Sequence, residues 1–270
     1  MRVPEGDTVW LTARRMHEAL AGRALTRSDF RVPQLATTDL TGRTVLEVVP
    51  RGKHMLTRLE GGLTLHTHFR MDGSWHLYRP GVRWAGGPDH EVRVVLTTES
   101  WVAVGYRLPV VELLRTGDED EVVGHLGPDL LGDDFDQALA VQRLLADPER
   151  AIGEALLDQT NLAGIGNLYK AEVLFLSGVW PWSPVGSVPD VAAMVVRAQR
   201  LLVANRSRAA QVTTGDLRPG RGTWVYGRAG RPCRRCGTRI RSSEQGAAPY
   251  ARITYWCPSC QPELRPDCPG

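Results

Sequence analysis

Hydrophobic and polar residues alternate with a period of two over much of the N-terminal part of the chain. Six short segments carry this alternation, and Gly, Pro and Asp residues separate them, as is typical of strands joined by turns. Their number and spacing predict a β-sandwich or a barrel. A helical period comes before them at about 8–21, with Gly22 available to end the helix. The predicted strands span 44–49, 55–59, 63–68, 75–78, 92–97 and 101–104.

After about Leu126 the period changes to that of helices. Four segments fit this pattern, at 135–145, 152–159, 168–177 and 191–204. The Cys- and Arg-rich stretch that follows is too small to be held together by apolar burial alone. We therefore predict an α+β multidomain protein. Its parts are a β-sandwich domain with a leading helix at 1–125, a helical domain at 126–222, a small module at 223–262 and a tail at 263–270.

The composition is that of a soluble globular protein, with 42% hydrophobic and 23% charged residues in 270. No apolar run approaches the length of a membrane span. Pro4, Glu5 and Asp7 precede any apolar stretch, which is the wrong order for a signal peptide. We therefore expect a cytoplasmic protein with no membrane partner. No coiled-coil pattern is present, so we expect a monomer.

Positive charge is concentrated near the C-terminus. The net charge is only +3, yet residues 206–265 contain twelve arginines against three acidic residues. Such asymmetry is typical of a surface that binds a polyanion, and equally of a solvated arginine-rich surface. Charge alone does not decide between the two.

Two cysteine knuckles, Cys233-Arg-Arg-Cys236 and Cys257-Pro-Ser-Cys260, are separated by twenty residues. This spacing lets four thiolates meet one tetrahedral Zn²⁺ ion. Two disulfides are disfavoured in the cytosol, and a redox-active pair is disfavoured by the second knuckle. We predict one structural zinc ion, because four protein thiolates leave no position for a catalytic water. Cys268 lies outside the pattern.

Between the knuckles, residues 250–256 alternate like a strand, and 237–240 could pair with them in a β-hairpin. Such a zinc-pinned hairpin would hold Arg252 at a fixed point, where its guanidinium could bind a phosphate. A surface arginine without a partner is the competing interpretation. The local sequence gives the two even odds.

Several motifs follow one another in a fixed order along nearly the whole chain. They are Pro4-Glu-Gly-Asp-Thr-Val9, Arg51-Gly-Lys-His54, Gly127-Pro-Asp129, Asp158-Gln159 with Gly164-Ile-Gly-Asn167, and the cysteine knuckles. In this order they resemble the formamidopyrimidine-DNA glycosylase and endonuclease VIII family. The Pro-Glu-Gly-Asp-Thr start resembles the endonuclease VIII branch of actinobacterial-type bacteria, whose usual substrates are oxidised pyrimidines. The resemblance implies a β-sandwich, a helix–two-turn–helix domain and a zinc ribbon, with damaged DNA, double- or single-stranded, as the partner.

The family mechanism uses a terminal secondary amine as nucleophile on the sugar C1′. It forms an iminium intermediate and then cleaves the strand by β/δ-elimination. The resemblance makes Pro4 this nucleophile and Glu5 the general acid/base. Lys53, on a glycine-containing turn, would hold a phosphate beside the lesion. Without the resemblance, a lone Pro, Glu or Lys at these positions would be ordinary.

The start of the chain departs from the family pattern, because Met1, Arg2 and Val3 precede Pro4. Inside a chain the proline nitrogen belongs to a tertiary amide and cannot form an iminium. We expect translation to start at Val3, read as methionine from a GTG codon, and removal of that methionine to expose Pro4. The bias towards arginine over lysine fits a GC-rich coding sequence with such starts. A freed α-amine titrates near ~7.7–8.0 in model peptides, so an appreciable fraction would be neutral and nucleophilic.

Two DNA contacts are implied by the resemblance outside the catalytic motifs. Asn167 follows a glycine turn that lets the backbone approach a phosphate, to which it would donate its amide; an ordinary helix cap is the alternative. Met71 resembles the apolar residue that fills the gap left by a flipped base; a core methionine is the alternative. His66 and His68 share a strand face, but no third ligand at suitable spacing predicts a metal site there.

Together the motifs predict a bifunctional DNA glycosylase and abasic-site lyase of base excision repair that excises oxidised bases, pyrimidines above all. We expect DNA in a cleft between domains, where Lys53, Asn167 and Arg252 contact phosphates around one lesion. Binding should weaken as salt rises. The main alternative is a catalytically inactive binder of damaged or abasic DNA, because Pro4 is not terminal as numbered. A transcription factor of unrelated fold would leave the Pro-Glu-Gly-Asp motif unexplained.

Overall fold

The computed structural model describes residues 4–208, 210–248 and 251–263. The chain divides into two compact units, one extending to His125 and the other starting at Leu126. We call them the N-terminal unit and the C-terminal unit. None of the helices in the described part of the chain combines the length and apolar content needed to cross a membrane.

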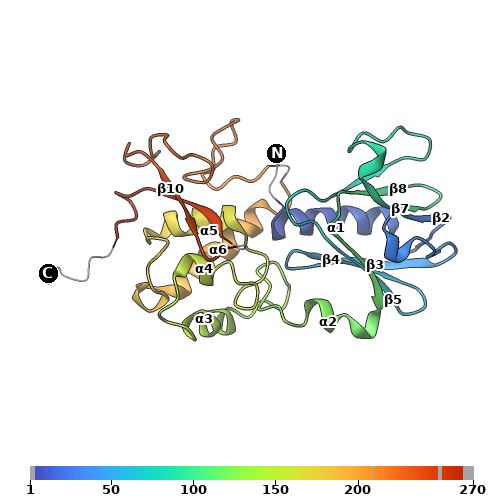
Figure 1. Cartoon of the computed structure of the whole chain (residues 1–270), viewed down its shortest axis with the longest axis horizontal. Helices are drawn as coiled ribbons and strands as arrows, with labels where there is room; N and C mark the ends of the chain where they lie inside the picture. The colour runs from blue at the N-terminus through green and yellow to red at the C-terminus, as the bar shows by residue number, and fades with distance from the viewer. Residues whose placement is uncertain (1–3, 209, 249–250, 264–270) are drawn as a thin grey trace. The chain divides into compact units, whose positions relative to one another are not determined.

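The N-terminal unit consists of two antiparallel sheets and a leading helix (Figure 1). One sheet has the strand order β1-β3-β4-β5-β9, and the other has the order β2-β7-β8-β6. The α-helices are α1 Gly6–Leu20 and α2 Asp120–Val123, and the 3₁₀ turns are η1 Pro33–Leu35, η2 Asp89–Glu91 and η3 Thr116–Asp118. The strands are β1 Arg23–Ala24, β2 Arg27–Phe30, β3 Thr44–Arg51, β4 His54–Leu59, β5 Leu63–His68, β6 Ser74–Tyr78, β7 Val92–Thr97, β8 Val102–Tyr106 and β9 Val110–Arg115.

One apolar core joins α1 to both sheets. Helix α1 contributes Val9, Met16 and Leu20, all fully buried, at a spacing that places them on one helical face. In β4 the alternate residues Met55 and Leu59 enter the same core. The β-sandwich with a leading helix predicted from the sequence is therefore confirmed, with β1, β2 and β9 as additional strands.

The C-terminal unit begins with helices. Asp136 and Asp190 accept a hydrogen bond from the backbone N–H three residues on, and so cap α3 and α6. Gly178, with φ at +70°, ends α5 in the left-handed conformation that favours glycine. The predicted helix at 152–159 is shorter than expected, because a turn begins after Ala155. The elements are α3 Gln137–Leu145, α4 Ile152–Ala155, α5 Asn167–Ser177, η4 Val185–Ser187 and α6 Val191–Asn205.

The C-terminal hairpin consists of β10 Arg241–Gln245 and β11 Arg252–Trp256, paired antiparallel. The sequence correctly predicts β11 but places its partner strand at 237–240, which instead forms the loop after the first cysteine knuckle. The cysteine module shares an apolar cluster with α5, in which Phe175 packs with Cys233, Ile240 and Cys257. Helix α5 and the cysteine module therefore share one apolar core.

Candidate functional site

Pro4 and Glu5 lie directly before the first turn of α1. The carbonyl oxygen of Glu5 accepts hydrogen bonds from the amides of Thr8 and Val9, at 2.9 and 3.1 Å. Glu5 is 1% exposed, and Asp7 in the first turn is fully buried. The positive end of the helix dipole favours carboxylates at this position. The buried acid Glu5 is thus next in sequence to Pro4, which is partly exposed.

Lys53 lies in the two-residue turn between β3 and β4. Arg51 pairs with His54 across the turn, and Gly52 has φ at +58°, as a type II′ hairpin turn requires at its first central position. Any residue with a Cβ would be strained there. The turn therefore presents Lys53 at one end of the five-stranded sheet, on the glycine-containing turn that the sequence predicts.

A histidine cluster lies on the same sheet, next to Lys53. The His54 Nδ1 and His66 Nε2 atoms are 2.8 Å apart, and His66 Nδ1 is 2.9 Å from Glu112 Oε2. Burial lowers the pKa of His54 to about 3 and that of His68 to about 4, assisted by the charge of Lys53 and by neighbouring histidines. Both ring nitrogens of His66 have protein partners, so this residue is not arranged as a metal ligand.

Met71 lies in the loop between β5 and β6 with 61% of its surface exposed, so it is not a core residue. The loop is tight, because Gly73 donates to the Phe69 carbonyl at 2.8 Å and a Cβ on Gly73 would clash with the Phe69 backbone. Arg70, directly before Met71, has φ at +46°, which is uncommon for a residue with a side chain. The constrained loop therefore holds an apolar side chain in solvent.

Arg107 supports this loop from the turn between β8 and β9. Its Nε atom donates to the Asp72 carbonyl at 3.1 Å, and its guanidinium also pairs with Glu91. Arg107 has φ at +48°, whereas the flanking Tyr106 and Leu108 are buried. Of the three residues, Arg107 alone has a side chain outside the core.

In the C-terminal unit, Gln159 holds the glycine turn that precedes α5. Its Oε1 accepts from the Gly164 amide, and its Nε2 donates to the Ile165 carbonyl, both at 3.1 Å. Gly164 has φ at +96°, so the turn depends on a residue without a Cβ. Asn167 opens the helix, and its Nδ2 donates to the Ile253 carbonyl of β11 at 2.8 Å.

The same contact brings Asn167 close to Arg252, the residue that precedes Ile253. Arg252 is exposed at the start of β11, where it pairs in register with Gln245. One helical turn further on, the buried Lys170 donates to Thr254 Oγ1 and lies 3.5 Å from Gln245 Oε1. The N-terminus of α5 and the hairpin therefore form one surface that contains both predicted phosphate contacts.

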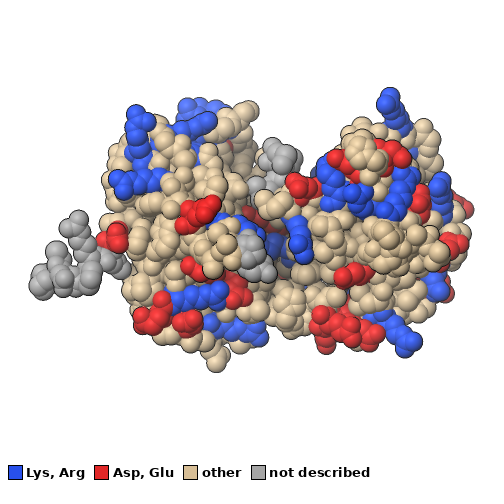
Figure 2. All heavy atoms as spheres, in the orientation of Figure 1, with Lys and Arg blue, Asp and Glu red and all other residues tan. Residues whose placement is uncertain are grey.

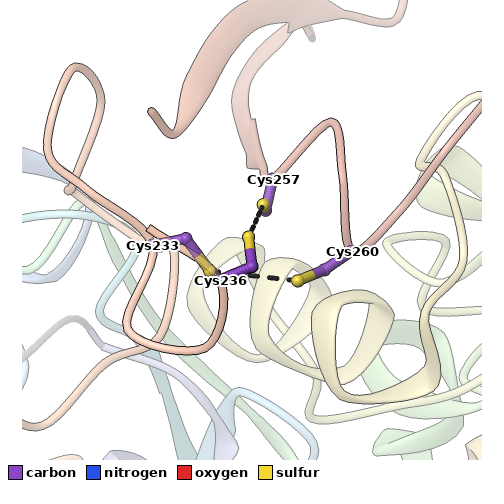
Figure 3. Close-up of side chains that lie close together, drawn as sticks. All are labelled: Cys233, Cys236, Cys257 and Cys260. Atoms are coloured by element: carbon purple, nitrogen blue, oxygen red, sulfur yellow. Dashed lines mark hydrogen bonds between the residues drawn. The ribbon is translucent and has the colours of Figure 1, made fainter. Parts of the chain in front are cut away.

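The four knuckle cysteines converge on one point (Figure 3). Their sulfur atoms all lie within 4.8 Å of one another, with Cys236 and Cys257 3.4 Å apart and Cys233 and Cys260 4.0 Å apart. Tetrahedral zinc with Zn–S bonds of about 2.3 Å requires S···S separations of about 3.8 Å, so the cluster fits such an ion. The Arg235 amide donates to Cys233 Sγ at 3.4 Å, which orients this thiolate.

Glu172 is fully buried in α5 and organises the segment before the knuckles. Its carboxylate accepts from the amides of Trp224, Val225 and Tyr226 at 2.8–2.9 Å and from the Thr213 hydroxyl. Burial raises the pKa of Glu172 even though these hydrogen bonds oppose the shift. The carboxylate thereby anchors both ends of the intervening loop to the helix.

Surface charge by itself does not mark a nucleic-acid face. On the side of the molecule in Figure 2, acidic side chains are interspersed with the basic ones on both units. Arg218, from the arginine-rich segment, forms a close ion pair with Asp216. Surface charge on this side of the molecule therefore identifies no binding face.

Family comparisons agree with this architecture. Residues 3–117 match the model of the formamidopyrimidine-DNA glycosylase N-terminal domain, and residues 126–204 match that of the formamidopyrimidine-DNA glycosylase H2TH domain. The fold resembles Lactococcus lactis Fpg in complex with DNA containing an abasic site, with a TM-score of 0.80 at 23% identity. This similarity covers 96% of this chain and 100% of that one.

Similar sequences span nearly the full length of the chain. A probable endonuclease 8 2 of Streptomyces coelicolor is 62% identical over 98% of this chain and 96% of its own length. The DNA-(apurinic or apyrimidinic site) lyase Nei2 of Mycolicibacterium smegmatis is 47% identical over 96% of this chain and 99% of its own. These names agree with the endonuclease VIII branch predicted from the first residues. The chain belongs to the formamidopyrimidine-DNA glycosylase and endonuclease VIII family.

Proposed function

We propose that the protein is a DNA glycosylase and abasic-site lyase of base excision repair with Pro4 as nucleophile. The observation that carries this proposal is the Pro4-Glu5 pair at the start of α1, in a chain whose relatives are named endonuclease 8 and abasic-site lyase. Attack of the Pro4 nitrogen on C1′ displaces the base and forms an iminium. Glu5, buried at the helix N-terminus, donates a proton to the opening sugar.

The chemistry requires that Pro4 be the first residue. A proline preceded by Val3 has no lone pair available for attack, because amide resonance delocalises it. This proposal therefore includes translation from Val3 and removal of the initiating residue. The protein that starts at Met1 should bind abasic DNA without cutting it, which is the inactive-binder alternative.

DNA binding is proposed to use cations and amides from both units. Lys53 lies at a hairpin turn of the N-terminal unit, and Asn167 and Arg252 lie on one surface of the C-terminal unit. All three residue types donate to phosphate oxygens. Met71, apolar and exposed on a constrained loop, is suited to fill the gap left by a flipped base. Zinc in the four-cysteine cluster would hold the hairpin that contains Arg252.

Borohydride trapping on an oligonucleotide with one abasic site tests the proposal. We expect a covalent adduct from protein starting at Pro4 and none from protein starting at Met1, with similar DNA affinity for both. A Pro4-initiated Glu5→Gln variant should bind DNA but excise damaged bases at least about a hundredfold more slowly. Excision of an oxidised pyrimidine, compared with oxidised guanine, tests the substrate class. If neither form is trapped while both bind, the protein is the inactive binder.

A further inference from the structure

Three residues on the outer face of the five-stranded sheet form a continuous hydrogen-bonded chain. His66 pairs in register with Glu112 of β9, and His54 pairs in register with His68 of β5. Alternation along β5 places His66 and His68 on one face, opposite to Leu65, which lies in the apolar core. Strand pairing thus brings these four polar side chains together from segments that are far apart in sequence. The hydrogen-bonded chain runs through three of them, His54, His66 and Glu112.

The partners fix the direction of each hydrogen bond. An ionised carboxylate only accepts, so His66 Nδ1 donates to Glu112 across the 2.9 Å contact. In the tautomer that has this one ring proton, the Nε2 atom of His66 carries a lone pair and accepts from His54 Nδ1 at 2.8 Å. The two rings are nearly coplanar, at 15°, so the lone pair and the N–H are aligned. His54 is left with a lone pair on Nε2.

The two ends of this hydrogen-bonded chain, His54 and Glu112, lie in different environments. Glu112 has 53% of its side chain exposed, whereas His66 has 4% exposed. At the other end, His54 follows Lys53 directly, and the charge of Lys53 acts on both His54 and His68. The chain therefore leads from the Lys53 end of the sheet, through a buried imidazole, to a carboxylate in water.

We propose that His54, His66 and Glu112 form a proton relay between the Lys53 end of the site and bulk solvent. When His54 Nε2 takes a proton from the site, its Nδ1 proton passes to His66 Nε2. The Nδ1 proton of His66 then passes to Glu112 and from there to water. One proton enters and one leaves, and both imidazoles end in the opposite tautomer. The relay rests on the proposed lyase function, whose elimination steps release protons from the sugar.

Burial and the groups around His54 favour a conduit over a proton store. His54 faces His66 and His68 of β5, Lys53 of the preceding turn and the exposed His125. Burial, together with these groups, lowers the pKa of His54 to about 3, so at neutral pH His54 is uncharged and does not store a proton. His66 and Glu112 act through His54 and are positioning residues.

Single-turnover cleavage of abasic DNA by Pro4-initiated protein tests the relay. We expect His54→Ala and Glu112→Gln to slow cleavage at least about tenfold with unchanged DNA affinity. Cleavage by both variants should rise with the concentration of imidazole buffer, because external base replaces the relay, whereas wild-type cleavage should not. His90→Gln and Glu99→Gln, which change exposed residues of the same unit, are the matched controls and should retain the wild-type rate.

The outcomes separate the relay from the lyase. If Pro4-initiated protein without further substitution gives no trapped adduct, the proposed function fails and the relay has no reaction to serve. If that protein is trapped and the relay variants cleave normally across about pH 6 to 9, the relay alone is refuted. Slow cleavage that imidazole does not restore would show a purely structural role for His54 and Glu112, and would also refute the relay.

Discussion

Acidification should destabilise the N-terminal unit through two histidines. Burial and neighbouring positive charges lower the pKa of His54 to about 3 and that of His68 to about 4, from 6.5 without these effects. Below about pH 6.5 the unfolded chain binds protons that the folded chain does not. The contribution of the two uncharged histidines to the unfolding free energy is therefore fully present above that pH. It is lost progressively as the pH falls towards the pKa values of the folded protein.

The size of the effect follows from the two pKa values. At about pH 5 each histidine costs about 2 kcal/mol of unfolding free energy, because one pKa unit corresponds to about 1.36 kcal/mol. This figure is an upper bound, since both side chains retain some contact with water. Wild-type protein should therefore lose about 2 kcal/mol more than His54→Gln between about pH 7 and about pH 5.

Amide hydrogen exchange of peptides from β4 and β5, corrected for the intrinsic effect of pH, measures this loss locally. The His90→Gln variant is the control, because His90 is exposed and should leave the pH dependence unchanged. An identical pH dependence in wild type and His54→Gln would mean that His54 titrates normally in the folded protein. The electrostatic description of the histidine cluster would then be wrong.

Three further predictions concern zinc, the loop that contains Met71 and the buried carboxylate of Glu172. Native mass spectrometry should detect about one zinc ion per chain in the unsubstituted protein and in Cys268→Ala, and none in Cys257→Ala. Met71→Ala should change the unfolding free energy by less than about 0.5 kcal/mol, yet slow base excision from duplex DNA about tenfold and leave single-stranded substrate unaffected. Glu172→Gln should lower the unfolding free energy in urea by about 3 kcal/mol or more, because an amide cannot accept all four hydrogen bonds, while the exposed Glu149→Gln should not.

The sequence predicts elements well where one periodic signal dominates. Strands β5 and β7 lie at the predicted residues, and α1 differs from its prediction by one or two residues at each end. Strand β9, Val-Val-Glu-Leu-Leu-Arg, was missed because its run of apolar residues breaks the alternation. The strand at 241–245 was missed because its residues are polar and mostly exposed, so pairing with β11 alone determines it.

Of the candidate site, the convergence of the four knuckle cysteines was predictable, because their spacing in the sequence is that of a four-cysteine cluster. The exposure of Met71 was not predictable, because the constraint comes from the Phe69–Gly73 contact. The hydrogen-bonded chain from His54 to Glu112 was likewise not predictable from the sequence. Its members come from three strands, and only strand register brings them together.

The shared core of α5 and the cysteine module limits how this protein can be re-engineered. Along one helix, Asn167 binds the hairpin backbone, Lys170 binds its side chains and Phe175 packs on the clustered cysteines. A ribbon grafted from a distant relative would meet a helix face shaped for a different partner. Replacement of the ribbon by that of another family member should therefore succeed only when the α5 residues that contact the ribbon are replaced with it. The two segments have to be exchanged together.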